Sequence, residues 1–94
     1  MAAYSFDGQS LKTRTGNRIG EIDGNTIKDA HSNKVGEIDG NIIKDANSNK
    51  IAVVDNDEIK DAYLKKIWTT EGVQQIIDGA GGITSAALWV LLLR

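Results

Sequence analysis

The sequence lacks several residue types that would point directly to a function class. It has no cysteine, which excludes a disulfide framework and thiolate chemistry. His31 is the only histidine, and no serine, cysteine or carboxylate constellation is built around it, so we expect no catalytic base. The net charge is −2, so no broad cationic surface is available for nucleic acid. We therefore expect a non-enzymatic protein with no cofactor and no nucleic-acid partner.

The sequence does contain a sixteen-residue phrase written in tandem. Residues 17–32, 33–48 and 49–64 are three copies of this phrase, and residues 1–16 fit the same frame more loosely. A fixed period of this kind indicates a repeat architecture. The 94 residues suffice for one small domain. Its first two thirds consist of the four units, and its last third has a different sequence.

Each unit predicts a β-hairpin. Aliphatic residues recur every eight positions from Ile19 to Ile67, which fits one short strand followed by a two-residue turn. The pairs 24–25 and 40–41 are both Gly-Asn, a sequence that closes tight turns. The Ser-Asn pairs 32–33 and 48–49 are weaker signals for two-residue turns at the alternate corners. We therefore expect eight short strands.

These turns predict which residues face one another on neighbouring strands. Across the Gly-Asn turns, apolar residues meet apolar partners and glutamate meets lysine, and such pairs contribute about 0.2–1 kcal/mol each. The same register is expected to continue across the Ser-Asn corners. The predicted pairs are Phe6/Leu11, Gly20/Asp29, Glu21/Lys28, Ile22/Ile27, Gly36/Asp45, Glu37/Lys44, Ile38/Ile43 and Val54/Ile59 across the turns, and Lys28/Glu37, Ala30/Val35 and Ala46/Ile51 across the corners.

Strand alternation then sorts the side chains into two faces. One face is apolar and should point inward, with Gly20, Gly36 and Ala52 leaving space. The other face carries the charged ladder, together with Ile19, Val35 and Ile51, which this assignment explains only in part. The inward face is a hypothetical apolar ligand-binding interior, lined by Ile22, Ile27, Ile38, Ile43, Val54 and Ile59.

The expected fold class is mainly β. Eight similar strands would leave two exposed edges, so we expect the four hairpins of residues 1–68 to close into a small antiparallel barrel with approximate four-fold symmetry. A β-solenoid with one unit per coil is the alternative. Tyr4 and Trp68 occupy inward positions, where they would plug one side of the barrel or mark its closure.

Residues 69–94 predict an amphipathic and then apolar helical segment. Thr69 or Thr70 can cap a helix with Glu71 in its first turn, and an apolar stripe runs through residues 73, 76, 77 and 80. Residues 80–94 would span about 22 Å as a helix, short of the ~30 Å core of a bilayer. A single-pass anchor is therefore not expected.

The apolar helix must still be buried, because residues 83–93 have no polar face. Three places are open to it: the barrel, a neighbouring subunit or a membrane surface. The residues expected to make a membrane or oligomer contact are Leu88, Trp89, Leu91, Leu92 and Leu93.

The repeated phrase, as in residues 35–46, followed by a Gly-rich break and the tail of residues 86–93, resembles the β-flower family. These are small, mostly bacterial proteins whose hairpins surround a shallow barrel, similar in shape to the tubby-like domains. The resemblance implies a lipid- or membrane-related role. It carries no catalytic motif onto this chain.

The recurrent aspartates have a structural interpretation. Asp29, Asp45 and Asp61 occupy one position of successive units, and Asp23, Asp39 and Asp55 precede the turns. We expect the first set to accept hydrogen bonds from turn or neighbouring-strand amides and the second to serve turn chemistry, rather than either to bind a metal.

Two functional hypotheses follow from the residues and the resemblance. The leading one is a lipid-binding or membrane-associated module in which the apolar interior works with the C-terminal helix. The alternative is a structural, homo-oligomeric protein whose helices bundle between subunits. No basic leader followed by an apolar run opens the chain, so we expect a cytoplasmic protein, peripheral at the membrane under the leading hypothesis.

Overall fold

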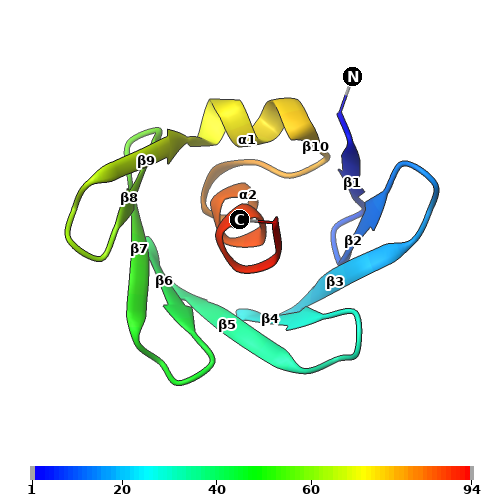
Figure 1. Cartoon of the computed structure of the whole chain (residues 1–94), viewed down its shortest axis with the longest axis horizontal. Helices are drawn as coiled ribbons and strands as arrows, with labels where there is room; N and C mark the ends of the chain where they lie inside the picture. The colour runs from blue at the N-terminus through cyan, green and yellow to red at the C-terminus, as the bar shows by residue number, and fades with distance from the viewer. Residues whose placement is uncertain (1, 94) are drawn as a thin grey trace.

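In the computed structural model, which describes residues 2–93, a single sheet of ten strands bends into an open ring around the end of the chain (Figure 1). Residues 1 and 94 of the ranges predicted above lie outside the described residues. The elements are β1 (Tyr4–Phe6), β2 (Ser10–Thr13), β3 (Arg18–Asp23), β4 (Thr26–Asp29), β5 (Lys34–Asp39), β6 (Ile42–Asp45), β7 (Lys50–Asp55), β8 (Glu58–Asp61), β9 (Lys66–Thr69), α1 (Thr70–Ile76), β10 (Ile77–Asp78), α2 (Gly82–Leu88) and the π-helical turn η1 (Trp89–Leu93).

The sheet is mainly antiparallel, as predicted, but it does not close. Its strand order runs from β10 through β1 to β9, so β9 and β10 are the two edges. Helix α1 lies between them along the rim (Figure 1) and buries Val73 completely. Because the chain turns into a helix after β9, no strand is available there to complete a barrel. The expected closure is therefore not met, and four-fold symmetry stays a prediction.

The register across the turns is confirmed. Ile22 pairs with Ile27, Ile38 with Ile43 and Phe6 with Leu11, each as expected. The remaining predicted turn pairs are also present, including Val54 with Ile59. The first turn residue has a positive φ, +64° at Gly24, +62° at Gly40 and +56° at Asn56, a conformation that glycine adopts freely and asparagine tolerates.

The register across the corners is wrong. Ile27 pairs with Gly36 and Thr26 with Glu37, so the predicted partners Ala30/Val35, Lys28/Glu37 and Ala46/Ile51 do not meet. The loop holds three residues, because the backbone N–H of Asp29 donates to the carbonyl of Asn33 at 2.9 Å. Ser32 takes a left-handed conformation at φ +66°. A corner of this type adds one residue to the loop and shifts the register.

A bulge at each corner also corrects the assignment of faces. Lys28 pairs with Lys34 while Ile27 pairs with Gly36, so Val35 has no cross-strand partner. The same irregularity recurs at residues 19, 51 and 67, which are the unpaired extra residues of their bulges. A bulge reorients the extra side chain, and these four residues pack against the core rather than standing with the charged ladder. They are Ile19, Val35, Ile51 and Ile67.

The C-terminal segment begins as expected and then departs from prediction. The Thr69 side chain caps α1 by accepting from the N–H of Gly72 at 3.0 Å. The helix ends at Ile76, and Ile77 instead forms a parallel bridge to Tyr4. The free edge of β1 offers backbone hydrogen-bonding groups to Ile77, and these groups would stay unpaired if the helix continued. Ile77 is also β-branched, which favours a strand.

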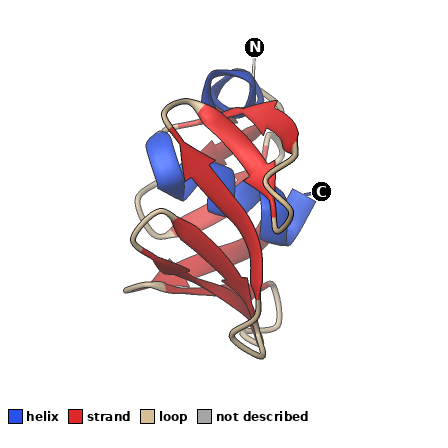
Figure 2. Cartoon of the chain, turned by 90° about the vertical axis from the view of Figure 1, so that its left-hand side faces the viewer, coloured by secondary structure: helices blue, strands red, loops and turns tan. Residues whose placement is uncertain are grey.

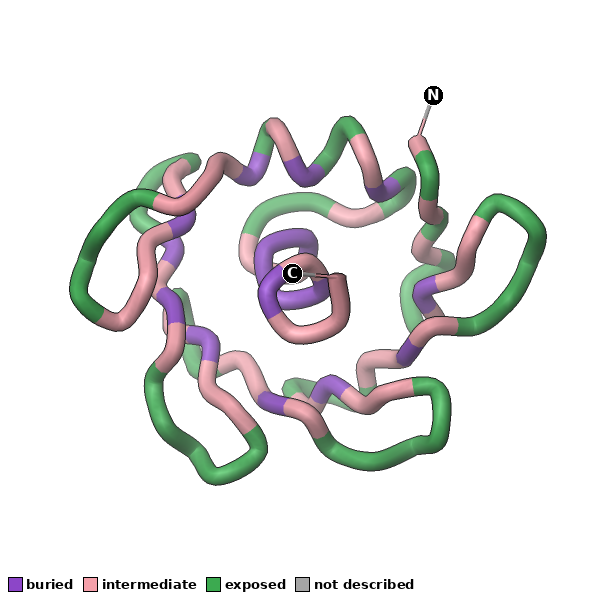
Figure 3. The backbone as a smooth tube through the Cα atoms, in the orientation of Figure 1, coloured by how far each residue is buried: buried purple, intermediate pink, exposed green. Residues whose placement is uncertain are grey.

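The core of the ring is formed by α2 and η1. Figure 3 shows the buried residues gathered on the central helix and on the inner side of the strands, while the corner loops are exposed. Of the three burial sites left open by the sequence, the helix occupies the first, the ring of its own chain. The fully buried apolar residues, at 0% exposure, are Leu11, Ile27, Ile43, Ala52, Ile59, Val73, Ala86, Ala87 and Leu88.

Candidate functional site

The ring interior is filled by protein. Of the expected ligand-binding residues, Ile27, Ile43 and Ile59 are fully buried, and Val54 is 9% exposed. Ile22 and Ile38 are half-buried and pack against the same core. No pocket opens among residues 2–93. A lipid chain in the interior would have to displace α2 and η1.

Two glycines form the seat of the helix end. A Cβ atom placed on Gly20 would lie 2.7 Å from Leu92 Cδ1 and 2.5 Å from the carbonyl oxygen of Lys28. On Gly36 it would lie 2.6 Å from Leu91 Cδ1 and would also meet the carbonyl of Lys44. The contact residues predicted for a membrane or a subunit, Leu91 and Leu92, therefore pack first against the ring itself.

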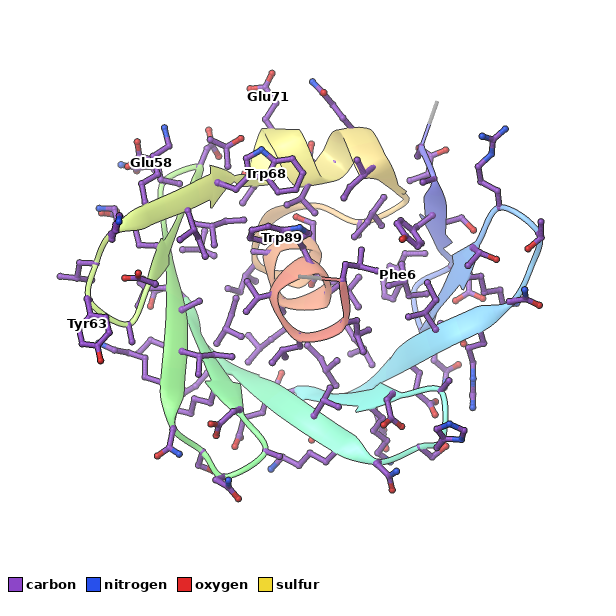
Figure 4. All side chains as sticks on the ribbon, in the orientation of Figure 1. Phe6, Glu58, Tyr63, Trp68, Glu71 and Trp89 are labelled. Atoms are coloured by element: carbon purple, nitrogen blue, oxygen red, sulfur yellow. The ribbon has the colours of Figure 1, made fainter. Side chains whose placement is uncertain are left out.

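The other predicted contact residues, Leu88, Trp89 and Leu93, also pack against the inside of the ring. Leu88 is fully buried, and Leu93 is half-buried against the core. The Trp89 ring meets Trp68 of β9 edge-on, with centroids 4.8 Å apart (Figure 4). Trp68 belongs to the edge strand β9, and Tyr4 belongs to β1, which pairs with the other edge strand, β10.

The helix crosses the ring from one end to the other. Gly79, just before it, lies against the carbonyl of Phe6, next to a hairpin turn. Leu91 and Leu92, near its end, touch Gly36 and Gly20, next to the first residues of β5 and β3. Figure 2 shows this crossing from the side. The end of η1 at Leu93 thus lies where the odd-numbered strands begin.

We call this end the helix-end face. At its centre are Leu91, Leu92 and Leu93, all half-buried. Around them four strands, β3, β5, β7 and β9, each begin with an exposed cation followed by one of the half-buried bulge residues. These pairs are Arg18–Ile19, Lys34–Val35, Lys50–Ile51 and Lys66–Ile67.

The cations of the helix-end face are only weakly neutralised. Arg18 lies 3.4 Å from Glu21, and Lys34 lies 3.4 Å from Glu37; exposed pairs of this kind contribute about 0–1 kcal/mol. Lys50 takes part in no ion pair among residues 2–93, and the place of its glutamate is taken by Val53. Of the four cations that begin these strands, Lys50 is therefore the one most available to an external anion.

The corner aspartates are held by their own loops, as predicted. The carboxylate of Asp29 accepts from the N–H of His31 at 2.9 Å and of Asn33 at 3.0 Å, and Asp45 and Asp61 repeat this arrangement. The amide of Asn33 is the main cause that lowers the pKa of Asp29, and the amide of Asn49 lowers the pKa of Asp45 in the same way. One carboxylate oxygen of each, Oδ1, is thus engaged within its loop.

The opposite end of the ring has a different chemistry. Asp23, Asp39 and Asp55 stand beside the tight turns and pair with lysines of the following strands, Lys44 reaching Asp39 at 3.0 Å. No group of three or more metal-ligating side chains occurs within the described residues. The apolar residues of the helix end and the cations that begin the strands therefore belong to one end only.

Sequence reasoning missed one exposed feature next to the helix-end face, in the corner loop before β9. Tyr63 and Leu64, at the tip of the fourth corner, are 91% and 62% exposed. Figure 4 shows Tyr63 at the outer edge of the ring, pointing away from it. The signal was available in the repeat, because the two preceding units carry His31–Ser32 and Asn47–Ser48 in this place.

Among residues 2–93, no helix is long and apolar enough to cross a bilayer.

Comparisons with protein-family models, with curated proteins and with solved structures find no match. The site is therefore interpreted from its own residues.

Proposed function

We propose that this protein is a non-enzymatic module that binds the surface of anionic membranes through the helix-end face. The single observation that carries the proposal is the composition of that face. The half-buried end of an apolar helix is encircled by four strand starts that each pair a cation with an aliphatic residue.

The physical argument is that each part suits one layer of a membrane surface. Exposed lysine and arginine gain about 1 kcal/mol each near an anionic leaflet. Aliphatic side chains that are only half-buried gain further by leaving water at the boundary between headgroups and acyl chains. The ring supplies a rigid support, so the face needs no folding step on binding.

The packing of the helix favours this proposal over bundling between subunits. Ala86, Ala87 and Leu88 are fully buried within the chain's own ring. A bundle would have to withdraw them and leave the ring without its core. The same cost applies to a lipid chain held inside the ring.

The proposal is tested by sedimenting the full-length protein with vesicles of phosphatidylcholine alone or mixed with phosphatidylserine. We expect binding to the anionic vesicles that weakens with salt. Lys50→Gln should weaken it about fivefold, the equivalent of about 1 kcal/mol.

Gln75→Glu is the matched control, because it changes the net charge by the same amount on the exposed side of α1, away from the face. It should leave binding nearly unchanged. Equal loss in both variants would indicate a general charge effect, and absence of binding to anionic vesicles would overturn the proposal.

A further inference from the structure

The fourth corner loop, residues 62–65, differs from the corners before it in what it exposes. Tyr63 and Leu64 are the only large hydrophobic residues that are exposed among residues 2–93. Unit one carries Thr15–Gly16, unit two His31–Ser32 and unit three Asn47–Ser48 at these positions. Only this corner therefore presents an aromatic and an aliphatic side chain to solvent.

The loop does not need these side chains for its own structure. Asp61 accepts from the N–H of Tyr63 at 2.9 Å and of Lys65 at 3.0 Å, as its counterparts do in the other corners. The N–H of Leu64 donates to the Asp61 carbonyl at 3.0 Å. The backbone arrangement is the same with His–Ser or Asn–Ser at the tip.

Leu64 is moreover an unfavourable residue for this place. Its φ is +65°, in the left-handed region that leucine rarely adopts. Strained residues of this kind are concentrated at functional sites. Serine or glycine at this position would serve folding at least as well as a strained and exposed leucine.

The surroundings of the loop indicate what it meets. It connects β8 to β9 and leads directly into the Lys66–Ile67 pair of the helix-end face, and Lys65 and Lys66 follow the tip. Lys65 joins no ion pair among residues 2–93, and Lys66 makes a single exposed pair, 3.6 Å from Glu58. Tyrosine favours the membrane–water interface, leucine the acyl chains, and lysine the anionic headgroups.

We infer that the loop of residues 62–65 is an insertion loop, which places Tyr63 and Leu64 in an anionic bilayer while Lys65 and Lys66 contact lipid phosphates. This inference rests on the proposed function. A bilayer is the occupant because an exposed tyrosine and leucine, directly followed by two exposed lysines, match the interface, the acyl chains and the anionic headgroups of a single lipid surface.

The repeat itself supplies the test variant. Tyr63→Asn with Leu64→Ser copies the corner of unit three and keeps the Asp61 hydrogen bonds. With full-length protein and vesicles containing phosphatidylserine, we expect binding to fall about tenfold or more. Asn47→Tyr with Ser48→Leu, which copies the tip into unit three, should strengthen binding, and circular dichroism should show both variants folded.

A second readout places the loop directly. The chain has no cysteine, so Tyr63→Cys can be labelled with a polarity-sensitive dye, with Asn25→Cys at the opposite end of the ring as control. We expect a blue shift at position 63 on anionic vesicles and none at position 25.

The outcomes separate this inference from the proposed function. If the native protein binds vesicles and the unit-three copy binds equally well, the insertion loop is overturned and the proposed function stands. If the native protein binds no vesicles, both fail. If it binds none but forms dimers that the unit-three copy loses, the loop is a protein contact and the inference is overturned.

Discussion

The hairpins of residues 4–69 and the helical segment of residues 70–93 illustrate two ways in which a sequence determines structure. In the hairpins, a residue's place follows from partners a few positions away, as in the pair Ile22/Ile27. In the helical segment, it follows from distant residues, as where Leu92 lies on Gly20. Local patterns therefore predict the first region and not the second.

The two regions also depend on each other for stability. Short hairpins are marginal by themselves in water, and the inner aliphatic residues of this ring have the helix as their covering. The helix in turn has no polar face that could remain in water. We conclude that neither region forms a stable unit alone.

The largest expected effect comes from removing one region. A chain that lacks residues 73–94 loses Val73, Ile77, Leu88 and Val90, all buried at 9% exposure or less. Each contributes about 1.5–3 kcal/mol, so together they approach the ~5–15 kcal/mol net stability of a domain. We expect the sheet signal in circular dichroism to vanish and a synthetic peptide of residues 73–94 to restore it. A truncated chain that melts cooperatively with a full sheet signal would show the helix to be dispensable.

Two leucines provide the next comparison. Leu88 is fully buried and Leu64 is 62% exposed at φ +65°. Leu88→Ala should lower the free energy of unfolding by about 2–5 kcal/mol. Leu64→Gly should raise it by about 1 kcal/mol, because glycine relieves the left-handed strain. Urea denaturation measures both, and a similar loss in the two variants would contradict the assigned burial.

The seat of the helix offers a smaller effect. Gly36→Ala places a methyl group against Leu91 and the Lys44 carbonyl, which should cost about 1–3 kcal/mol. Ala52→Gly, at the equivalent position of the next unit, is the matched control and should cost about 0.5–1 kcal/mol. Thermal unfolding followed by circular dichroism ranks them, and the reverse order would mean that the helix does not rest on Gly36.

The smallest effect concerns the corner carboxylates. Loop amides lower the pKa values of the corner residues Asp29 and Asp45 below the ordinary value of about 3.9. A lowered folded-state pKa stabilises the protein above the unfolded value, and this stabilisation is lost as pH falls through the folded value. The free energy of unfolding should therefore be level above about pH 5 and fall below about pH 4. Asp29→Asn with Asp45→Asn should flatten that fall; an unchanged pH profile would exclude the corner carboxylates as its source.

Sequence reasoning predicted the hairpins because a two-residue turn and a period of two specify their register. It failed at the corners because it assumed two-residue turns, whereas the corner after Asp29 is a three-residue loop with Ser32 in a left-handed conformation, followed by a bulge. The same error placed Ile19 and its counterparts on the charged face. In the structure a bulge turns them toward the core.

The candidate site was less predictable than the fold. The leucines at positions 91–93 stood out by composition, but their seat on Gly20 and Gly36 depends on the path of the chain after Ile76. Ile77 pairs with Tyr4 of β1, which lies more than seventy residues earlier in the chain. A contact over that separation leaves no local pattern in the sequence.

The central claim is that α2 and η1 form the core of the ring, which places their end at the face proposed to bind membranes. Amide hydrogen exchange of the free full-length protein tests it most directly. We expect the amides of residues 86–90 to exchange as slowly as those within β5, because both open only on global unfolding. Rapid exchange of residues 86–90 beside protected strands would contradict the account and show a helix that lies outside its ring.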